Sequence, residues 1–151
     1  MQPLPHHYNV TVIASEEAST EITSRGLNPL ISAPPSEFDG PGNLWSPETL
    51  TVAAVADCLV LTFRAISSAS KLRWTKLVCD GQGTVDRSDG VIRFTAIQLH
   101  ARLVLPAGAD EEKARRLLDK AEKACLVGNS LKFVPTLQVD VMFDEPALAL
   151  A

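Results

Sequence analysis

The stretch Ser46–Arg64, SPETLTVAAVADCLVLTFR, decides the fold that this sequence predicts. Ser46 is a suitable N-cap, because its hydroxyl can accept a hydrogen bond from a free amide of the first helical turn. Pro47 suits the first helical position, and Glu48 brings a negative charge to the positive end of the helix dipole. The residues that follow are apolar on nearly every face, which indicates a buried helix. Cys58 lies in the middle of this helix.

Length and composition describe one ordinary globular domain. The chain has 151 residues, of which 46% are hydrophobic and 21% charged, with a net charge of −4. No basic patch of the kind that nucleic acid requires is present, and no apolar run reaches the roughly 18 residues of a membrane span. We therefore expect a single cytoplasmic domain over residues 1–151, with residues 1–7 and 144–151 as flexible or peripheral termini, binding neither nucleic acid nor membrane.

The rest of the chain alternates between strand-like and helix-like patterns. Three short strands are expected first, as an antiparallel meander, and a hairpin of two long strands follows the central helix. A second helix begins after Asp110 and ends at Gly128, and a final strand closes the chain. This order, βββ-α-ββ-α-β, predicts an α+β fold with antiparallel sheets packed around a long buried central helix. The expected strands are residues 8–14, 20–24, 27–32, 71–85, 90–106 and 132–143.

The chain contains three cysteines, Cys58, Cys79 and Cys125. An odd and low count argues against a framework of structural disulfides. Cys58 has two interpretations from its own segment, a small hydrophobic core residue or a reactive thiolate in an apolar pocket. Cys125 follows Leu118 by seven residues and is expected on the same inward face of the second helix. We interpret Cys79 as structural.

The ordered set of these features resembles the OsmC/Ohr family of bacterial peroxidases. The set consists of a Pro/Gly-rich approach, the Pro47-Glu48 helix start, Cys58 ten residues beyond Glu48, and Cys125 after a Lys/Ala-rich helix. The resemblance implies an intertwined homodimer. It also implies a thiol-dependent reduction of organic hydroperoxides in which Cys58 attacks, Cys125 resolves and Glu48 orients a cation. The implied partner is an external dithiol such as a lipoylated protein, and neither a cofactor nor a metal is implied.

A buried thiol needs help to ionise, because burial raises its pKa. Cys58 lies mid-helix, so the sequence predicts that a cation must compensate. The arginine that the family supplies is absent at its expected places, where Glu17 or Glu37 stands, and Arg25 is the nearest substitute in sequence. Ten helical residues span about 15 Å, so Glu48 can serve Cys58 only through another side chain or across a two-fold interface.

Two other classes of function stay open from the sequence. One is a non-enzymatic small-molecule-binding or structural dimer with the cysteines retained as core residues. The other is a hydrolytic or acyl-transferring enzyme with a cysteine nucleophile, which lacks a histidine partner near either helix. His100 shares one strand face with Gln98 and Arg102, and we expect it to be exposed or hydrogen-bonded rather than catalytic.

Overall fold

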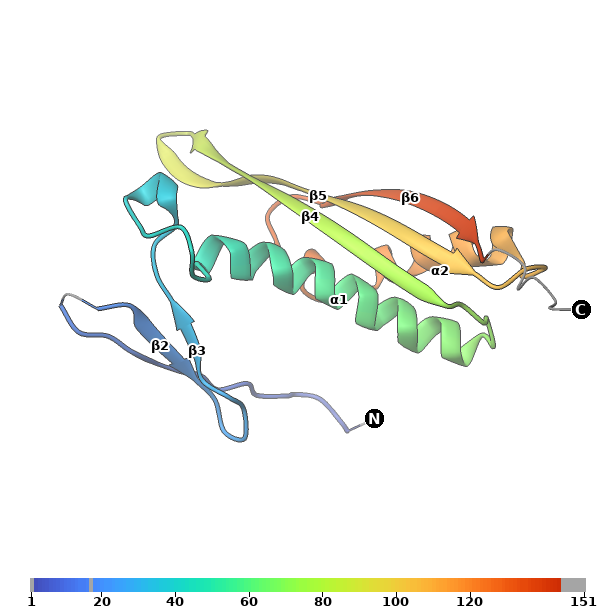
Figure 1. Cartoon of the computed structure of the whole chain (residues 1–151), viewed down its shortest axis with the longest axis horizontal. Helices are drawn as coiled ribbons and strands as arrows, with labels where there is room; N and C mark the ends of the chain where they lie inside the picture. Colours follow the sequence, from blue (N-terminus) through green and yellow to red (C-terminus); the bar gives the residue numbers. More distant parts are fainter. Residues whose placement is uncertain (1, 17, 145–151) are drawn as a thin grey trace, which may run out of the picture. The chain divides into compact units, whose positions relative to one another are not determined.

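The computed structural model describes residues 2–16 and 18–144. Its element order confirms the predicted βββ-α-ββ-α-β arrangement (Figure 1). The chain divides into two compact units, residues 1–50 and 51–151, which are described separately below. The prediction of one domain over residues 1–151 stays a prediction, and of the expected termini, residues 1 and 145–151 lie outside the described residues. The elements are β1 (Thr11–Ile13), β2 (Thr20–Thr23), β3 (Leu30–Ser32), the 3₁₀ helix η1 (Ser36–Phe38), α1 (Pro47–Ala69), β4 (Lys76–Ser88), β5 (Val91–Leu105), α2 (Glu111–Lys123), the 3₁₀ helix η2 (Gly128–Ser130) and β6 (Thr136–Phe143).

The first unit contains the expected three-stranded meander. β1 pairs with β2 and β2 with β3, both antiparallel, in the spatial order β1-β2-β3. Gly26, with φ of 79°, supplies the left-handed backbone of the turn between β2 and β3. β3 starts directly after Pro29 and lies at the edge of the sheet, where the missing N–H of proline breaks no ladder bond.

The start of α1 is capped as the sequence predicts. The Thr49 amide donates to Ser46 Oγ at 3.1 Å, and the Ser46 amide donates to Thr49 Oγ1 at 2.9 Å. This reciprocal pair satisfies one amide inside the helix and one outside it, as in a capping box. Pro47 is the first helical residue, where its lack of an N–H costs nothing.

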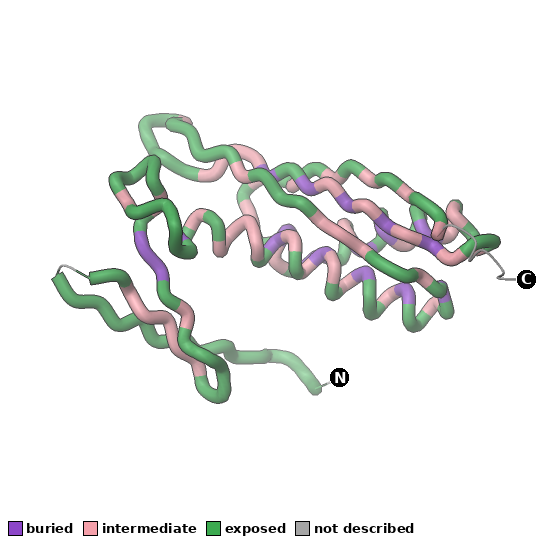
Figure 2. The backbone as a smooth tube through the Cα atoms, viewed as in Figure 1, coloured by how far each residue is buried: buried purple, intermediate pink, exposed green. Residues whose placement is uncertain are grey.

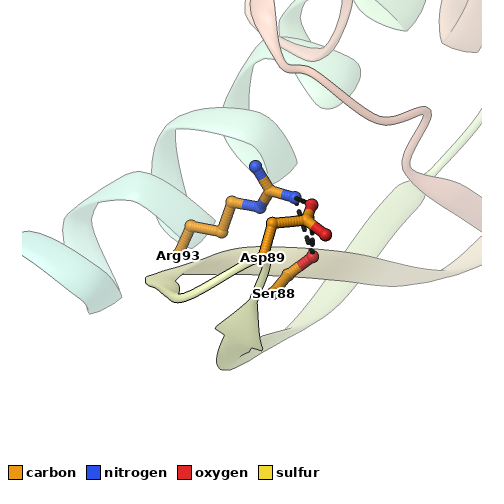
Figure 3. Close-up of polar contacts among 3 residues, drawn as sticks. All are labelled: Ser88, Asp89 and Arg93. Carbon is orange, nitrogen blue, oxygen red and sulfur yellow. Dashed lines mark hydrogen bonds and ion pairs between the residues drawn. The ribbon is translucent and has the colours of Figure 1, made fainter.

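In the second unit, β4 and β5 form the expected hairpin. Asp89 and Gly90 make its two-residue turn with φ of 51° and 79°, the left-handed pair that matches the twist of the strands. Arg93 closes the tip, because its guanidinium donates to Ser88 Oγ at 2.7 Å and to Asp89 Oδ2 at 3.0 Å (Figure 3).

One prediction about this sheet is wrong. The expectation of purely antiparallel sheets fails at β6, which pairs with β5 in parallel, from Gln98 opposite Thr136 to Leu105 opposite Phe143. The reason is topological: α2 and its connections carry the chain back along the sheet, so β6 enters in the same direction as β5. The resulting order is β4-β5-β6, with a mixed sheet.

The core of the second unit lies on one face of β5. The inward residues of β5 alternate along the strand, and both helices contribute apolar stripes to the same cluster. In Figure 1, α1 runs along the β4-β5-β6 sheet, and Figure 2 shows buried positions along β5 and at intervals along α1. The buried residues of this cluster are Val55, Leu59, Phe63, Leu72, Ile97, Leu99, Ala101, Leu103, Leu105, Ala114, Leu118 and Ala121.

In the single chain, the central helix packs into the core along one of its faces. Only Val55, Leu59, Phe63 and Ser67 of α1 are buried, a single stripe at i, i+4 spacing. Leu61 points away from that stripe and is 42% exposed. By length and composition alone α1 could cross a membrane, yet its buried stripe packs in the core of the second unit.

Candidate functional site

The two cysteines predicted to react lie together. Cys58 is half-buried on α1, one position before the buried Leu59. Cys125 is 4% exposed and lies in the connection between α2 and β6. The side chains of the two cysteines form a hydrogen bond. The structure therefore brings the thiols within contact despite the long sequence separation.

The position of Cys125 differs from the prediction in one respect. α2 ends at Lys123 rather than at Gly128, so Cys125 does not belong to the helix. The chain turns instead: the Asn129 side chain donates to the Lys123 carbonyl at 3.0 Å, and the Asn129 amide donates to the Cys125 carbonyl at 2.9 Å. This local wrapping caps the end of α2 and leaves the amides of residues 126–128 near the two sulfurs.

The Cys125 sulfur contacts the backbone of both Gly128 and Val55. The Gly128 amide donates to Cys125 Sγ at 3.4 Å, and the same sulfur lies 3.9 Å from the carbonyl oxygen of Val55 on α1. A Cβ at position 128 would lie 3.3 Å from Cys125 Sγ, tighter than most contacts of that kind. A glycine at this position thus permits the close approach of backbone to sulfur.

The pKa of Cys58 is lowered, although burial, the largest single influence, acts to raise it. Backbone hydrogen bonds from Val127 and Leu126 and side-chain hydrogen bonds from Cys125 and Thr62 favour the thiolate, and together they outweigh burial. No cation contributes. In the single chain, amide, thiol and hydroxyl donors therefore offset the effect of burial, and the expected cation stays a prediction.

The pKa of Cys125 moves the other way. Burial raises it most, and the hydrogen bond and negative charge of Cys58 raise it further, while the amides of Gly128 and Val127 oppose the change only in part. The two shifts therefore favour ionisation of Cys58 before Cys125. Of the two thiols, Cys58 is the one whose pKa favours the thiolate, the form that acts as a nucleophile.

A pocket of about 460 Å³ opens beside Cys125. Its floor is apolar, and its rim carries the polar residues Glu122, Lys123, Asn129 and Lys132. Cys58 is not among the residues that line it. The apolar lining comes from α1, β5 and the connection to β6, namely Val55, Leu59, Leu99, Leu131, Phe133, Val134 and Pro135.

Glu48, the third predicted site residue, belongs to the first unit, whereas both cysteines belong to the second, and its role stays a prediction. Its Oε2 atom is buried and has no hydrogen-bond partner within residues 2–16 and 18–144. Arg25, the predicted substitute cation, is exposed, and Glu17 lies outside the described residues.

Two other candidate residues are Cys79, whose pKa is raised, and His100, which has a local hydrogen-bond partner. Burial and the charge of Asp80 raise the pKa of Cys79 to about 11. His100 Nε2 lies 2.6 Å from Asp140 Oδ2 on the outer face of the sheet, as expected of a hydrogen-bonded residue. No cluster of three or more His, Cys, Asp or Glu side chains suited to a metal occurs among the described residues.

The sequence interpretation missed the amides of Leu126, Val127 and Gly128 and the hydroxyl of Thr62. A signal for the amides exists, because a glycine three residues after Cys125 permits a tight turn at the sulfur. Thr62 lies one helical turn after Cys58, the spacing at which two side chains of a helix meet.

Comparison with known proteins supplies the family context. Residues 40–140 match the family described as OsmC-like protein. A curated relative, the uncharacterized protein YmaD of Bacillus subtilis, is 28% identical over 109 residues, which cover 70% of this chain and 73% of that protein.

Solved structures share the fold at low sequence identity. An OsmC-like protein of unknown function from Vibrio cholerae superposes with a TM-score of 0.81 at 15% identity, covering 90% of this chain and 100% of that one. An organic hydroperoxide resistance protein OsmC from Legionella pneumophila gives 0.72 at 20% identity, covering 93% and 99%. An organic hydroperoxide resistance protein from Elizabethkingia anophelis gives 0.72 at 17% identity, covering 93% and 100%.

Proposed function

Since the chain belongs to the family of OsmC-like proteins, we propose that it reduces organic hydroperoxides to alcohols in the cytoplasm, as part of an oxidative stress response. Cys58 is the attacking thiol and Cys125 the resolving thiol. The names of the structural neighbours from Legionella pneumophila and Elizabethkingia anophelis, both organic hydroperoxide resistance proteins, support this substrate class.

The single observation that carries the proposal is the unequal thiol pair. Cys58 has a lowered pKa and Cys125 a raised one, with a hydrogen bond between them. A thiolate is the nucleophile in attack on peroxide, and a neighbouring thiol can capture the product. A cysteine retained only for packing has no need of four hydrogen-bond donors directed at its sulfur.

In the first step, the Cys58 thiolate attacks one oxygen of the O–O bond. That bond breaks, Cys58 becomes a sulfenic acid, and the other oxygen leaves as an alkoxide that takes up a proton to form the alcohol. The thiolate is oxidised by two electrons and the peroxide is reduced by two. The helix around Cys58 is largely apolar in sequence, which suits a peroxide that carries an organic group.

In the second step, the Cys125 sulfur attacks the sulfenic sulfur of Cys58 and releases water, forming a Cys58–Cys125 disulfide. Oxidation of Cys58 removes the negative charge that raises the pKa of Cys125, so Cys125 becomes easier to deprotonate when it is needed. An external dithiol, such as a lipoylated protein, then reduces the disulfide.

The proposal includes a homodimer. Most of α1 lies outside the buried stripe, and large apolar residues of the β1-β2-β3 sheet are also exposed, at 57% for Val12 and 56% for Ile13. Exposed apolar faces of this kind are typical of subunit interfaces. In this assembly Glu48, with its unpartnered carboxylate oxygen, orients a cation from the second subunit. Sedimentation at micromolar concentration tests the assembly, and a monomer contradicts it.

The activity is tested by following the loss of cumene hydroperoxide in the presence of a small dithiol. The wild type is expected to turn over, and the Cys58→Ser variant is expected to be inactive, because a hydroxyl cannot form the sulfenate. Cys79→Ser is the matched control and should retain full activity.

Equal rates for the wild type and Cys58→Ser would contradict the enzymatic proposal. In that case the pocket beside Cys125 favours the second candidate, a non-enzymatic dimer that binds a small apolar molecule.

A further inference from the structure

We propose that the reducing dithiol enters through the pocket beside Cys125 and attacks the Cys125 sulfur of the disulfide, rather than that of Cys58. The occupant is the thiol end of an apolar chain. This inference rests on the proposed disulfide between the two cysteines, and it adds a separate entrance and a direction of attack for the reductant.

The first argument is the position of the pocket. Cys125 lines it and Cys58 does not, although the two side chains touch. Displacement at sulfur proceeds with the attacking thiolate roughly in line with the S–S bond, on the far side from the leaving sulfur. A cavity that is lined by Cys125 and not by Cys58 gives a reductant access to the Cys125 sulfur rather than to that of Cys58.

The second argument is the shape and chemistry of the cavity. Its volume of about 460 Å³ falls in the range of small-molecule sites, roughly 300–1,000 Å³. The lining is largely apolar, with Leu131, Phe133 and Val134 contributed by the segment that leads into β6. An apolar chain that ends in a thiol fits this lining better than a charged peptide thiol.

The third argument is the choice of leaving group. A thiol of lower pKa leaves a disulfide faster. Attack on Cys125 expels Cys58, whose pKa is lowered by its hydrogen-bond donors. Attack on Cys58 would expel Cys125, whose pKa is raised.

The reductant reduces the protein disulfide through two successive displacements at sulfur. The first thiolate of the reductant forms a bond to Cys125 Sγ, the bond between the two cysteine sulfurs breaks, and its electron pair leaves on Cys58 as a thiolate. The second thiolate of the reductant then attacks its own sulfur in the mixed disulfide and closes a cyclic disulfide. Cys125 leaves as a thiolate and takes a proton from water. The dithiol is oxidised by two electrons and the protein disulfide is reduced by two.

The direct test identifies which cysteine carries the mixed disulfide. The Cys58–Cys125 disulfide is formed with diamide in a Cys79→Ser background, treated briefly with one equivalent of benzyl mercaptan, quenched with acid, alkylated and mapped by peptide mass spectrometry. The expected product has the benzylthio group on Cys125 and the alkyl group on Cys58. A benzylthio group on Cys58, or failure of diamide to form the disulfide, overturns the inference.

A second test blocks the entrance. Val134 lines the pocket and is 85% exposed, so Val134→Trp fills the mouth without disturbing the core. Reduction of the diamide-formed disulfide by benzyl mercaptan should slow by about tenfold or more, since misplacement of a reactant by about 1 Å costs up to about a hundredfold. Val91→Trp, at a 56% exposed position of the hairpin, is the matched control and should reduce at the wild-type rate. Equal rates for Val134→Trp and the wild type overturn the inference.

The two proposals fail separately, because diamide forms the disulfide without peroxide. A protein that is inactive on hydroperoxides but carries the benzylthio group on Cys125 disproves the proposed activity and leaves the entrance intact. A protein that turns over hydroperoxide but carries the adduct on Cys58 disproves the entrance alone.

Discussion

Cys79 on β4 and Cys58 beside the α2–β6 connection are both half-buried, yet their pKa values move in opposite directions. Burial and Asp80 raise the pKa of Cys79 to about 11, while hydrogen-bond donors lower that of Cys58. Cys79 stands opposite Ala101 in the β4–β5 ladder, where strand pairing uses the backbone donors. The amides of residues 126–128 belong to no such ladder. Main-chain amides outside a strand ladder can therefore lower the pKa of a neighbouring thiol, as a cation would.

This comparison also explains why the family arginine can be absent from its expected places. A thiolate that accepts several hydrogen bonds has a lower pKa without a full positive charge nearby. In this chain the α2–β6 connection supplies those bonds from Leu126 and Val127, and Cys125 and Thr62 add two more.

The largest effect is expected from removing the resolving thiol. Cys125→Ser should still permit one oxidation of Cys58, because the attacking thiolate remains, but it should stall recycling. Steady-state loss of cumene hydroperoxide with a dithiol should fall to a single equivalent per subunit. Mass spectrometry should find Cys58 as a sulfenic or overoxidised acid. Sustained multiple turnover in this variant would show that Cys125 is not the resolving residue.

A smaller effect is expected from removing one amide donor. Val127 has φ of −68°, which proline adopts, so Val127→Pro deletes the N–H with little change at that residue. A hydrogen bond to a charged group contributes about 1.5–3 kcal/mol, so the pKa of Cys58 should rise by about one to two units. The rate of Cys58 alkylation, followed as a function of pH, measures this pKa.

The control for this change is Val127→Ala, which keeps the amide and should keep the wild-type pKa of Cys58. If Val127→Pro retains native circular dichroism and an unchanged Cys58 pKa, the backbone amide is not what stabilises the thiolate.

The smallest effect is expected at Glu48. Glu48→Gln should lower the rate of peroxide reduction while the fold persists, since a charge in the first turn of a helix contributes only about 0.3–1 kcal/mol to stability. Thermal unfolding measures the stability and peroxide consumption the rate. A variant with wild-type activity would reduce Glu48 to a residue of the helix dipole.

Much of the fold follows from the sequence because its signals are local. The Ser46 cap and the start of the second helix after Asp110 each involve side chains and backbone a few residues apart, and the structure confirms both. Burial of α1 on one stripe only, and the parallel pairing of β6, depend on how distant elements meet. The hydrophobic periodicity of a sequence does not indicate how elements far apart in the chain pack or pair with one another.

The same distinction between local signals and contacts of distant elements applies to the candidate site. The pairing of Cys58 with Cys125 was predicted through a family resemblance, and the structure brings the two side chains into contact. Two of the donors that lower the pKa of Cys58 are main-chain amides, which have no residue type of their own to recognise in a sequence. Gly128 indicates a turn, but it does not indicate which cysteine sulfur accepts hydrogen bonds from the amides of that turn.

The most direct test of the account is the pKa of the Cys58 thiol, measured by the pH dependence of alkylation in the Cys79→Ser variant. The thiolate fraction rises with pH, so the alkylation rate should rise with pH and level off above the pKa of Cys58. The account predicts a midpoint below that of free cysteine titrated under the same conditions, with Cys58 alkylated before Cys125. A midpoint above that value, or faster alkylation of Cys125, would contradict it.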